Sequence, residues 1–224
     1  MSLDIVARYG YPTFMRKQEK TVPSSRTGVR LLDVAEVFAG VGVSREETVA
    51  RPGERLPVIG VRDLQDGAVA PREALDTVGF SSPSKAMTYA AQTDDVLVTG
   101  RGTLLKFGLV GDETAGAIAS ANIIVVRPGP DAAGGALFAI LSSDVFRPKI
   151  EVLRRGATTL LSLSPKDLAK LEINLPSPSE QERIAALVKD AQVAYRTALE
   201  AAEIRRSLAR RLIDARLFGD NQNH

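Results

Sequence analysis

The chain has 224 residues, a formal net charge of +2 and no cysteine, and its only histidine, His224, is the last residue. The length allows one domain with an extension or two small domains. The composition disfavours disulfides, thiol catalysis, histidine-based catalysis and zinc sites with cysteine or histidine ligands. Neither a membrane-spanning apolar run nor a secretion signal is present, so we expect a cytoplasmic protein with no membrane partner. The near-neutral charge allows nucleic-acid binding without indicating it.

The first part of the chain changes from irregular to regular near residue 28. Residues 1–27 are polar and predict a loosely ordered leader, with a basic arm that touches phosphate as the alternative. Apolar runs then predict a strand or helical turn over 29–40 and a buried strand within 56–64, followed by a turn at 65–67. The segment 68–94 is polar and rich in Ser, Pro and Ala.

The central part predicts three more strands and then a helix. The strands are expected over 94–103, where a basic loop flanked by glycines ends the strand, and over 106–110 and 117–126. Residues 135–153 have helical spacing, and Pro148 should break or kink that helix. Ser164 is expected to cap a short helix, and residues 171–175 predict a strand that runs into Pro176. We therefore expect a mixed α/β (α+β) globule over 28–176.

The C-terminal part predicts a single long helix over 179–218, because no glycine or proline interrupts it. Ser179 and Glu182 have the spacing of a capping box, and Gly219 stands where a C-cap is expected before a short tail, 219–224. About 40 helical residues reach roughly 60 Å. Such a length exceeds one small domain, so a helix folded back on its own globule is disfavoured and a partner is expected.

An apolar stripe with steps of three and four residues gives this helix a coiled-coil-like seam. Alanines in the middle of the stripe would let a second helix approach closely. Five arginines between 205 and 216 suit an acidic partner or a DNA backbone. The residues expected at a dimer or partner interface are Ile184, Leu187, Val188, Ala191, Tyr195, Ala198, Ala202, Leu208 and Leu212.

Candidate sites in the globule are basic rather than catalytic. The loop 100–103 lacks the spacing of a P-loop or a dinucleotide site, and it is either an ordinary turn or a place where backbone and Arg101 approach DNA. Asp94-Asp95 and Asp112-Glu113 are interpreted as turn residues, and no serine has a base at motif spacing, so we expect no enzyme activity. Cations at expected loop tips matter only if they share one face: Arg45, Arg51, Arg62, Lys85, Lys106, Arg154 and Arg155.

The segment LSLSPKDLAKLEINLPSPSEQERIAALV resembles the C-terminal border of a target-recognition domain in the specificity subunits of type I restriction–modification systems. In that family a leucine, a short strand, a proline-rich turn and Glu-Gln-x-x-Ile lead into a long conserved helix. The order LLDVAEVFAG, VIGVRDL, DDVLVTGRGT, Arg127-Pro128 and Arg154-Arg155-Gly156 upstream is also similar. The resemblance extends over about residues 29–218, and its matching residues at the border are Leu168, Leu171, Ile173, Leu175, Pro176, Pro178, Glu180, Gln181 and Ile184.

The resemblance implies a non-catalytic subunit that reads double-stranded DNA. Methyl transfer from S-adenosylmethionine would belong to a modification subunit and ATP- and Mg-dependent cleavage to a restriction subunit, so no cofactor is expected in this chain. Family members commonly carry two recognition domains and two antiparallel helices, whereas this chain has one of each, which implies a homodimer through the helix and a bipartite target. The residues expected to contact DNA are Arg101, Gly102, Thr103, Lys106, Arg154, Arg155, Lys85 and Arg62.

Two other functions remain open from the sequence. The chain could be a protein-interaction or scaffold module whose helix docks a partner and whose globule never touches DNA. An enzyme with an unrecognised site is disfavoured, because histidine and cysteine are effectively missing.

Overall fold

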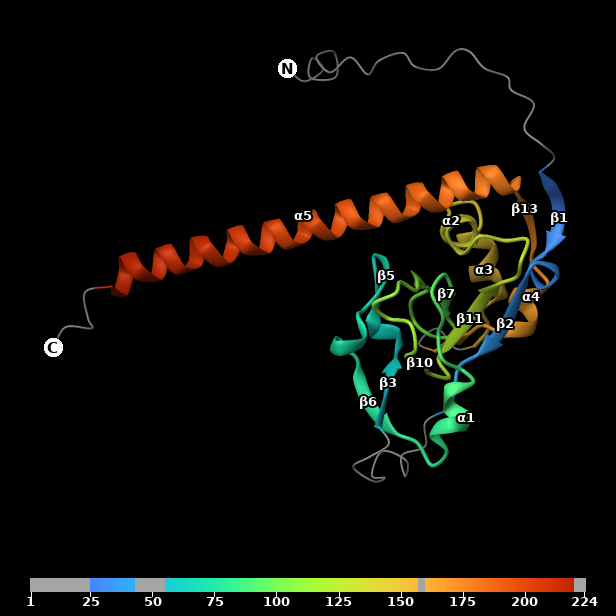
Figure 1. The fold of residues 1–224 in the computed structure, drawn as a ribbon, viewed down its shortest axis with the longest axis horizontal. Helices are drawn as coiled ribbons and strands as arrows, with labels where there is room; N and C mark the ends of the chain where they lie inside the picture. Colours follow the sequence, from blue (N-terminus) through green and yellow to red (C-terminus); the bar gives the residue numbers. More distant parts are fainter. Residues whose placement is uncertain (1–24, 43–54, 157–159, 220–224) are drawn as a thin grey trace, which may run out of the picture.

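The computed structural model describes residues 25–42, 55–156 and 160–219. The leader up to residue 24, Arg45, Arg51 and the tail 220–224 lie outside these ranges. Strand β1 (Arg26–Arg30) begins two residues before the expected boundary of the globule and pairs antiparallel with β13 (Glu172–Leu175), with Val29 opposite Ile173. The first and last described strands of the globule therefore lie side by side (Figure 1).

A mixed sheet of six strands forms the centre of the globule, in the order β2-β11-β7-β9-β5-β4. Its pairs are antiparallel except for β5 with β9, which is parallel. Strand β7 is buried on both faces, which explains why it appears in the sequence as an unbroken apolar run. The strands are β2 (Ala35–Ala39), β4 (Leu64–Gln65), β5 (Gly67–Val69), β7 (Val96–Thr99), β9 (Phe107–Leu109) and β11 (Ile123–Pro128).

A second sheet, of three short strands, lies beside the first in the order β10-β3-β6. Val58, Phe80, Ala86 and Ile118 form its own small apolar cluster. Its strand β6 and the helix α1 come from the polar segment 68–94, where no apolar periodicity marks them. The elements are β3 (Arg55–Ile59), β6 (Asp76–Gly79), α1 (Pro83–Met87) and β10 (Ile118–Ala119), with the 3-10 turns η1 (Leu31–Asp33), η3 (Val61–Asp63) and η4 (Arg72–Ala74) connecting strands.

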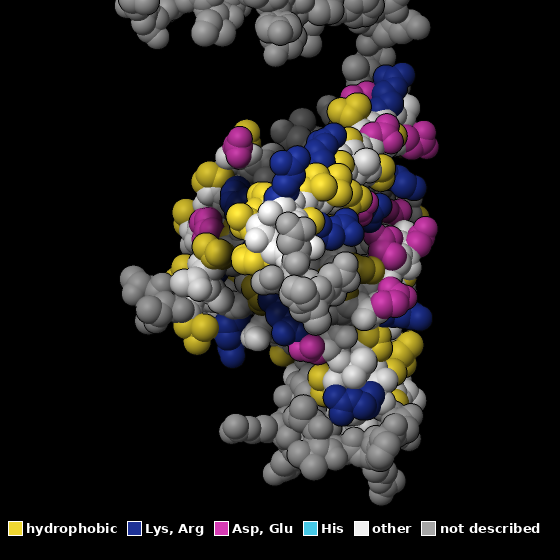
Figure 2. Space-filling view, turned by 90° about the vertical axis from the view of Figure 1, so that its left-hand side faces the viewer, with side chains coloured by type: hydrophobic (Ala, Val, Ile, Leu, Met, Phe, Trp, Pro, Cys, Tyr) yellow, Lys and Arg dark blue, Asp and Glu magenta, His cyan; other side chains and the backbone are white. Residues whose placement is uncertain are grey.

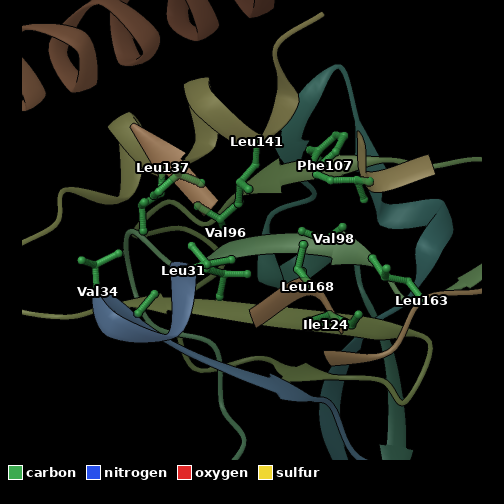
Figure 3. Packing of buried hydrophobic residues seen from close by; sticks show 14 of the residues in the cluster. Leu31, Val34, Val96, Val98, Phe107, Ile124, Leu137, Leu141, Leu163 and Leu168 are labelled. Atoms are coloured by element: carbon green, nitrogen blue, oxygen red, sulfur yellow. The ribbon is translucent and has the colours of Figure 1, made fainter. Parts of the chain in front are cut away.

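Three helices, α2 (Gly134–Ser142), α3 (Arg147–Leu153) and α4 (Pro165–Ala169), complete the main core. Leu137 and Leu141 of α2 point toward Val96 and Val98 of β7, and all four are fully buried (Figure 3). The predicted break near Pro148 is confirmed, and the proline sits in the first turn of α3, where a missing N–H costs nothing.

Helix α5 spans Pro178–Phe218 and projects far beyond the globule (Figure 1). The fold class, a mixed α/β globule followed by one long helix, is thus confirmed. The capping-box prediction is wrong: the helix begins one residue earlier than Ser179, its N-cap is Ser177, and no side chain caps it. The reason is that Pro178 suits the first helical turn rather than a position outside it. Gly219 is the C-cap as expected, and its N–H donates to the Ala215 carbonyl at 2.9 Å.

Gln181 fixes the base of α5 to the globule. Its side chain is 3 % exposed and accepts from the Ala133 N–H at 2.8 Å, while its amide group donates to the carbonyls of Pro176 and Asp131 at 2.9 and 3.3 Å. Farther along, α2 approaches so closely that a Cβ on Gly135 would lie 2.7 Å from the Ala185 Cα. The direction of α5 is therefore set by buried polar and close-packed contacts. Among the described residues, no helix has the length and apolar character needed to cross a membrane.

Replacing Gln181 with alanine should lower the free energy of unfolding by about 2–3 kcal/mol, because the backbone groups of Ala133, Asp131 and Pro176 lose their hydrogen-bond partner. The midpoint of urea unfolding, followed by circular dichroism, measures the change. Glu182→Ala, one residue along on the exposed side of the helix, is the matched control and should shift that midpoint by less than about 0.5 kcal/mol. Equal shifts for the two variants would contradict the role assigned to Gln181.

Candidate nucleic-acid interface

The loop 100–105 connects β7 to β9 and contains the short strand β8 (Arg101–Gly102). The N–H groups of Gly100 and Arg101 donate to the Asn122 carbonyl at 2.7 and 3.2 Å. On the other side, β8 pairs with β12 (Leu161–Ser162), and Leu163 N–H donates to the Gly100 carbonyl at 2.7 Å. Two chain segments that are distant in sequence, at Asn122 and at 161–163, therefore hold this loop. Gly102 has φ +147°, a conformation that favours glycine.

Arg154 lies beneath the loop instead of on its surface. Its side chain is 1 % exposed, and its guanidinium donates to the carbonyls of Gly102 and Thr103 and to Glu151 at 2.8 Å. The expectation that Arg154 contacts DNA is therefore corrected, because its side chain is buried and both of its terminal nitrogens donate inside the protein. The adjacent Arg155 is exposed, and its backbone pairs with Ser162.

The charged groups of Lys106 and Arg147 also donate hydrogen bonds to backbone carbonyls of the globule. The Lys106 ammonium donates to the carbonyls of Val61 and Leu64 at 3.3 and 3.1 Å. Arg147 donates to the Leu105 carbonyl at 2.7 Å and lies over the Phe107 ring, 5.6 Å from its centroid. Lys106 was expected to contact DNA, and its placement does not fit that expectation. Sequence alone could not distinguish these anchors from free cations.

The outer surface of the loop presents a mixed set of side chains. Arg101, Thr103 and Arg155 are exposed, as expected of side chains that contact DNA, and Gly102 contributes backbone only. The structure adds Leu104 and Leu160, which are 66 % and 56 % exposed, and the exposed Asn122 beside them. Arginine can bind guanine or phosphate, amides can bind adenine, and apolar side chains can contact the thymine methyl group. We call the six exposed residues of this surface the loop face: Arg101, Thr103, Leu104, Asn122, Arg155 and Leu160.

The other two expected DNA contacts, Arg62 and Lys85, lie on separate elements. Arg62 is paired with Asp76 and with Asp63, whose Oδ1 is 3.3 Å away, and these carboxylates raise the pKa of Arg62, with Asp76 contributing most. Lys85 is exposed on α1, at the small sheet. No contact joins either side chain to the loop face within the described residues. The expected cations are therefore divided among several places.

Asp95 is structural, as expected for the Asp94-Asp95 pair. Its buried carboxylate accepts from the Gln92 N–H at 2.8 Å and from Arg127 at 2.8 and 3.0 Å, and this hydrogen-bonded pairing raises the pKa of Arg127. The carboxylate thus joins β7 to β11 and is unavailable for proton transfer to a substrate. No group of three or more His, Cys, Asp or Glu that could hold a metal occurs in the described part of the chain.

The expected partner stripe on α5 divides into two parts. Ile184 and Val188 are half-buried at the globule, whereas the others are exposed, including Leu187 at 73 %, Leu208 at 49 % and Leu212 at 60 %. Tyr195 hydrogen-bonds to Asp66, which raises the pKa of the phenol. The remaining members, Ala191, Ala198 and Ala202, are also exposed. The far half of α5 therefore does not fold back on its own globule.

Comparison with known proteins decides the family. The family described as "Type I restriction modification DNA specificity domain" matches residues 25–206. The chain belongs to this family. The specificity domains of this family are non-catalytic. The hydrogen bonds of Asp95 within the globule are consistent with that. No curated protein matched the chain.

Solved structures of type I specificity subunits share the fold of this family member. A structure described as underlying complex assembly and conformational transition of the type I R-M system is 22% identical, with a TM-score of 0.58, over 92% of this chain and 47% of that one. The HsdS subunit from Thermoanaerobacter tengcongensis is 21% identical, with a TM-score of 0.51, over 91% and 46%. The S subunit from M. genitalium is 16% identical, with a TM-score of 0.58, over 92% and 49%. The chain spans about half the length of these structures.

Proposed function

We propose that this chain reads double-stranded DNA as a specificity subunit and directs a modification subunit and a restriction subunit to the target. The observation that carries the proposal is the loop face. The guanidinium groups of buried Arg154 and of Arg147 donate to carbonyls of the loop, so that Arg101, Thr103 and Arg155 extend outward from a rigid support. Rigid backbone with mixed polar and apolar tips suits base contacts, which specify sequence, better than it suits phosphate contacts alone.

A homodimer through α5 would complete the recognition of DNA. The chain has one recognition globule and spans about half of the subunits it resembles. Two copies related by a twofold axis would place two loop faces on one duplex and read two half-sites as an inverted repeat. The length of α5 would then fix the spacer between the half-sites.

The chemistry of the complex would lie in the partner subunits. S-adenosylmethionine would bind the modification subunit and ATP with Mg²⁺ the restriction subunit, and this chain would need no cofactor. Because its substrate is the cell's DNA, the complex would act in the cytoplasm. Sequencing of genomic methylation with and without this chain, expressed beside the modification subunit, tests the role: a methylated bipartite motif should appear only when the chain is present. Identical methylation in both samples would contradict it.

Replacing Arg101 with alanine should weaken binding to the cognate duplex by about 1–3 kcal/mol and binding to random duplex by clearly less. The reason is that a base contact is lost only where the correct base is present. Fluorescence anisotropy at one fixed salt concentration measures both affinities. Arg183→Ala, an exposed arginine at the base of α5, is the matched control and should change neither. Equal losses on the two duplexes would make Arg101 a phosphate contact.

A scaffold that never binds DNA is the alternative, and the exposed apolar stripe on the far half of α5 favours it. Figure 2, viewed from the side toward which α5 projects, shows hydrophobic, basic and acidic side chains intermixed instead of one continuous basic face. Binding to mixed-sequence duplex that weakens steeply with salt would exclude the scaffold. Absence of such binding, with and without the modification subunit, would favour it.

A further inference from the structure

The two exposed leucines of the loop face lie at one end of a small two-stranded ribbon. Strands β8 and β12 pair antiparallel, with Gly102 opposite Leu161. Because the strands run in opposite directions, Leu104 after β8 and Leu160 before β12 both follow the ribbon at this end. Leu104 is 66 % exposed and Leu160 is 56 % exposed. We call this part of the loop face the apolar end.

The exposed arginines of the loop face belong to the other end of the ribbon. Arg101 lies opposite Ser162 in the register of β8 and β12. The Arg155 N–H donates to the Ser162 carbonyl at 2.9 Å, and the Ser162 N–H donates back to the Arg155 carbonyl at 2.8 Å. None of the six residues of the loop face is acidic. The loop face therefore complements an anionic partner such as DNA.

The backbone is held on both sides of Leu104. The Arg154 guanidinium donates to the Thr103 carbonyl at 3.4 Å, and the Arg147 guanidinium donates to the Leu105 carbonyl at 2.7 Å. The Leu105 side chain is 2 % exposed and belongs to the main core. The side chain of Leu104 is therefore presented outward by a fixed turn, and it contributes little to the core.

An apolar side chain on a fixed turn is removed from water only when another molecule covers it. Two leucines are too few for a stable protein interface, which buries about 1,200–2,000 Å² in total. They suit instead a partner that presents a single apolar group among polar ones. The major groove of DNA admits a two-stranded β-ribbon, and in unmodified DNA the apolar group on its base edges is the C5-methyl group of thymine.

We propose that Leu104, with Leu160 beside it, contacts the C5-methyl group of a thymine in the major groove. The contact makes the apolar end selective for thymine at one position of each half-site, while the arginine end binds a neighbouring guanine or phosphate. This inference rests on the proposed function and adds to it a groove of the DNA, a chemical group on a base and the side chains that recognise it.

Replacement of thymine by deoxyuridine tests the contact, because deoxyuridine pairs with adenine in the same way and lacks only the methyl group. The probe is the duplex that selection from a random-sequence library enriches, with its thymines replaced one at a time. The affinity of the wild type should fall about fourfold at one thymine of each half-site, the effect expected from the burial of one methyl group. The other replacements should leave the affinity unchanged.

The Leu104→Ala variant connects that loss to its side chain. It should keep the unfolding midpoint of the wild type, since the side chain is exposed, and should bind the thymine and deoxyuridine duplexes equally well at the sensitive position. Leu32→Ala is the matched control, because Leu32 is 44 % exposed on η1, outside the loop face. It should retain the fourfold preference for thymine.

Three outcomes would overturn the methyl contact and leave the proposed function standing. They are an enriched motif that contains no thymine, a motif whose binding is insensitive to deoxyuridine, as for a leucine wedged between bases, and a preference for thymine that persists in Leu104→Ala. A selection that enriches no motif, with the chain alone and with the modification subunit, would overturn the methyl contact and the proposed function together.

Discussion

Replacing Arg154 with methionine is expected to lower the free energy of unfolding by about 3–5 kcal/mol. The side chain is 1 % exposed, and its guanidinium binds the carbonyls of Gly102 and Thr103 and the carboxylate of Glu151. Methionine fills a similar volume but cannot donate, so the loop carbonyls would lose their partner. Chemical unfolding followed by circular dichroism measures the loss.

The neighbouring arginine provides a control for Arg154. Arg155 is exposed, and Arg155→Met should change the free energy of unfolding by less than about 0.5 kcal/mol while weakening DNA binding. Arg154→Met should weaken sequence discrimination as well, because the loop loses its support. An unfolding midpoint unchanged in Arg154→Met would show that the buried hydrogen bonds do not hold the loop.

Ending the chain after Leu199 is expected to lower the affinity for a duplex with two half-sites by about 10²- to 10⁴-fold, the gain that linkage of two binding modules provides. The globule should remain folded, because the described contacts of α5 with it, from Gln181 to Arg196, all precede the cut. The affinity of the shortened chain for a single half-site should therefore stay within about threefold of the affinity of the full chain. A threefold change corresponds to less than about 1 kcal/mol of binding free energy.

Titration of full and shortened chains on one-site and two-site duplexes measures these affinities. A chain ending after Gln181 would be an unsuitable control, because it would remove Arg196 and the α2 contact. Equal affinities of the full and shortened chains for the two-site duplex would contradict a dimer through the far half of α5.

The sequence predicted those elements whose structure is determined by residues close together in the chain. Residues 96–98 of β7 and 123–126 of β11 are apolar without interruption because both faces are buried, and Pro148 separates two helices because it lacks an N–H. The length of α5 follows from the absence of internal glycine and proline. The capping-box spacing of Ser179 and Glu182 predicts a start that is one residue late, and only the geometry shows that Pro178 lies inside the helix.

The site was harder to predict from the sequence than the fold. The role of a cation depends on carbonyl groups that are distant in the sequence. Arg154 and Arg155 are adjacent and identical in type, yet one is buried beneath Gly102 and the other is exposed. The sequence gives no signal for this difference, nor for the exposure of Leu104. The loop flanked by glycines predicts Arg101 and Thr103 as DNA contacts, and both lie on the loop face.

The central claim is that two loop faces read DNA. Selection of bound duplexes from a random-sequence library, performed with the purified chain alone and again with the modification subunit, tests it most directly. Reading of DNA by two loop faces predicts enrichment of one motif made of two inverted half-sites with a fixed spacer. In the Arg101→Ala variant, enrichment should weaken at defined positions of each half-site. Duplexes retained without any enriched sequence in either preparation would contradict the account.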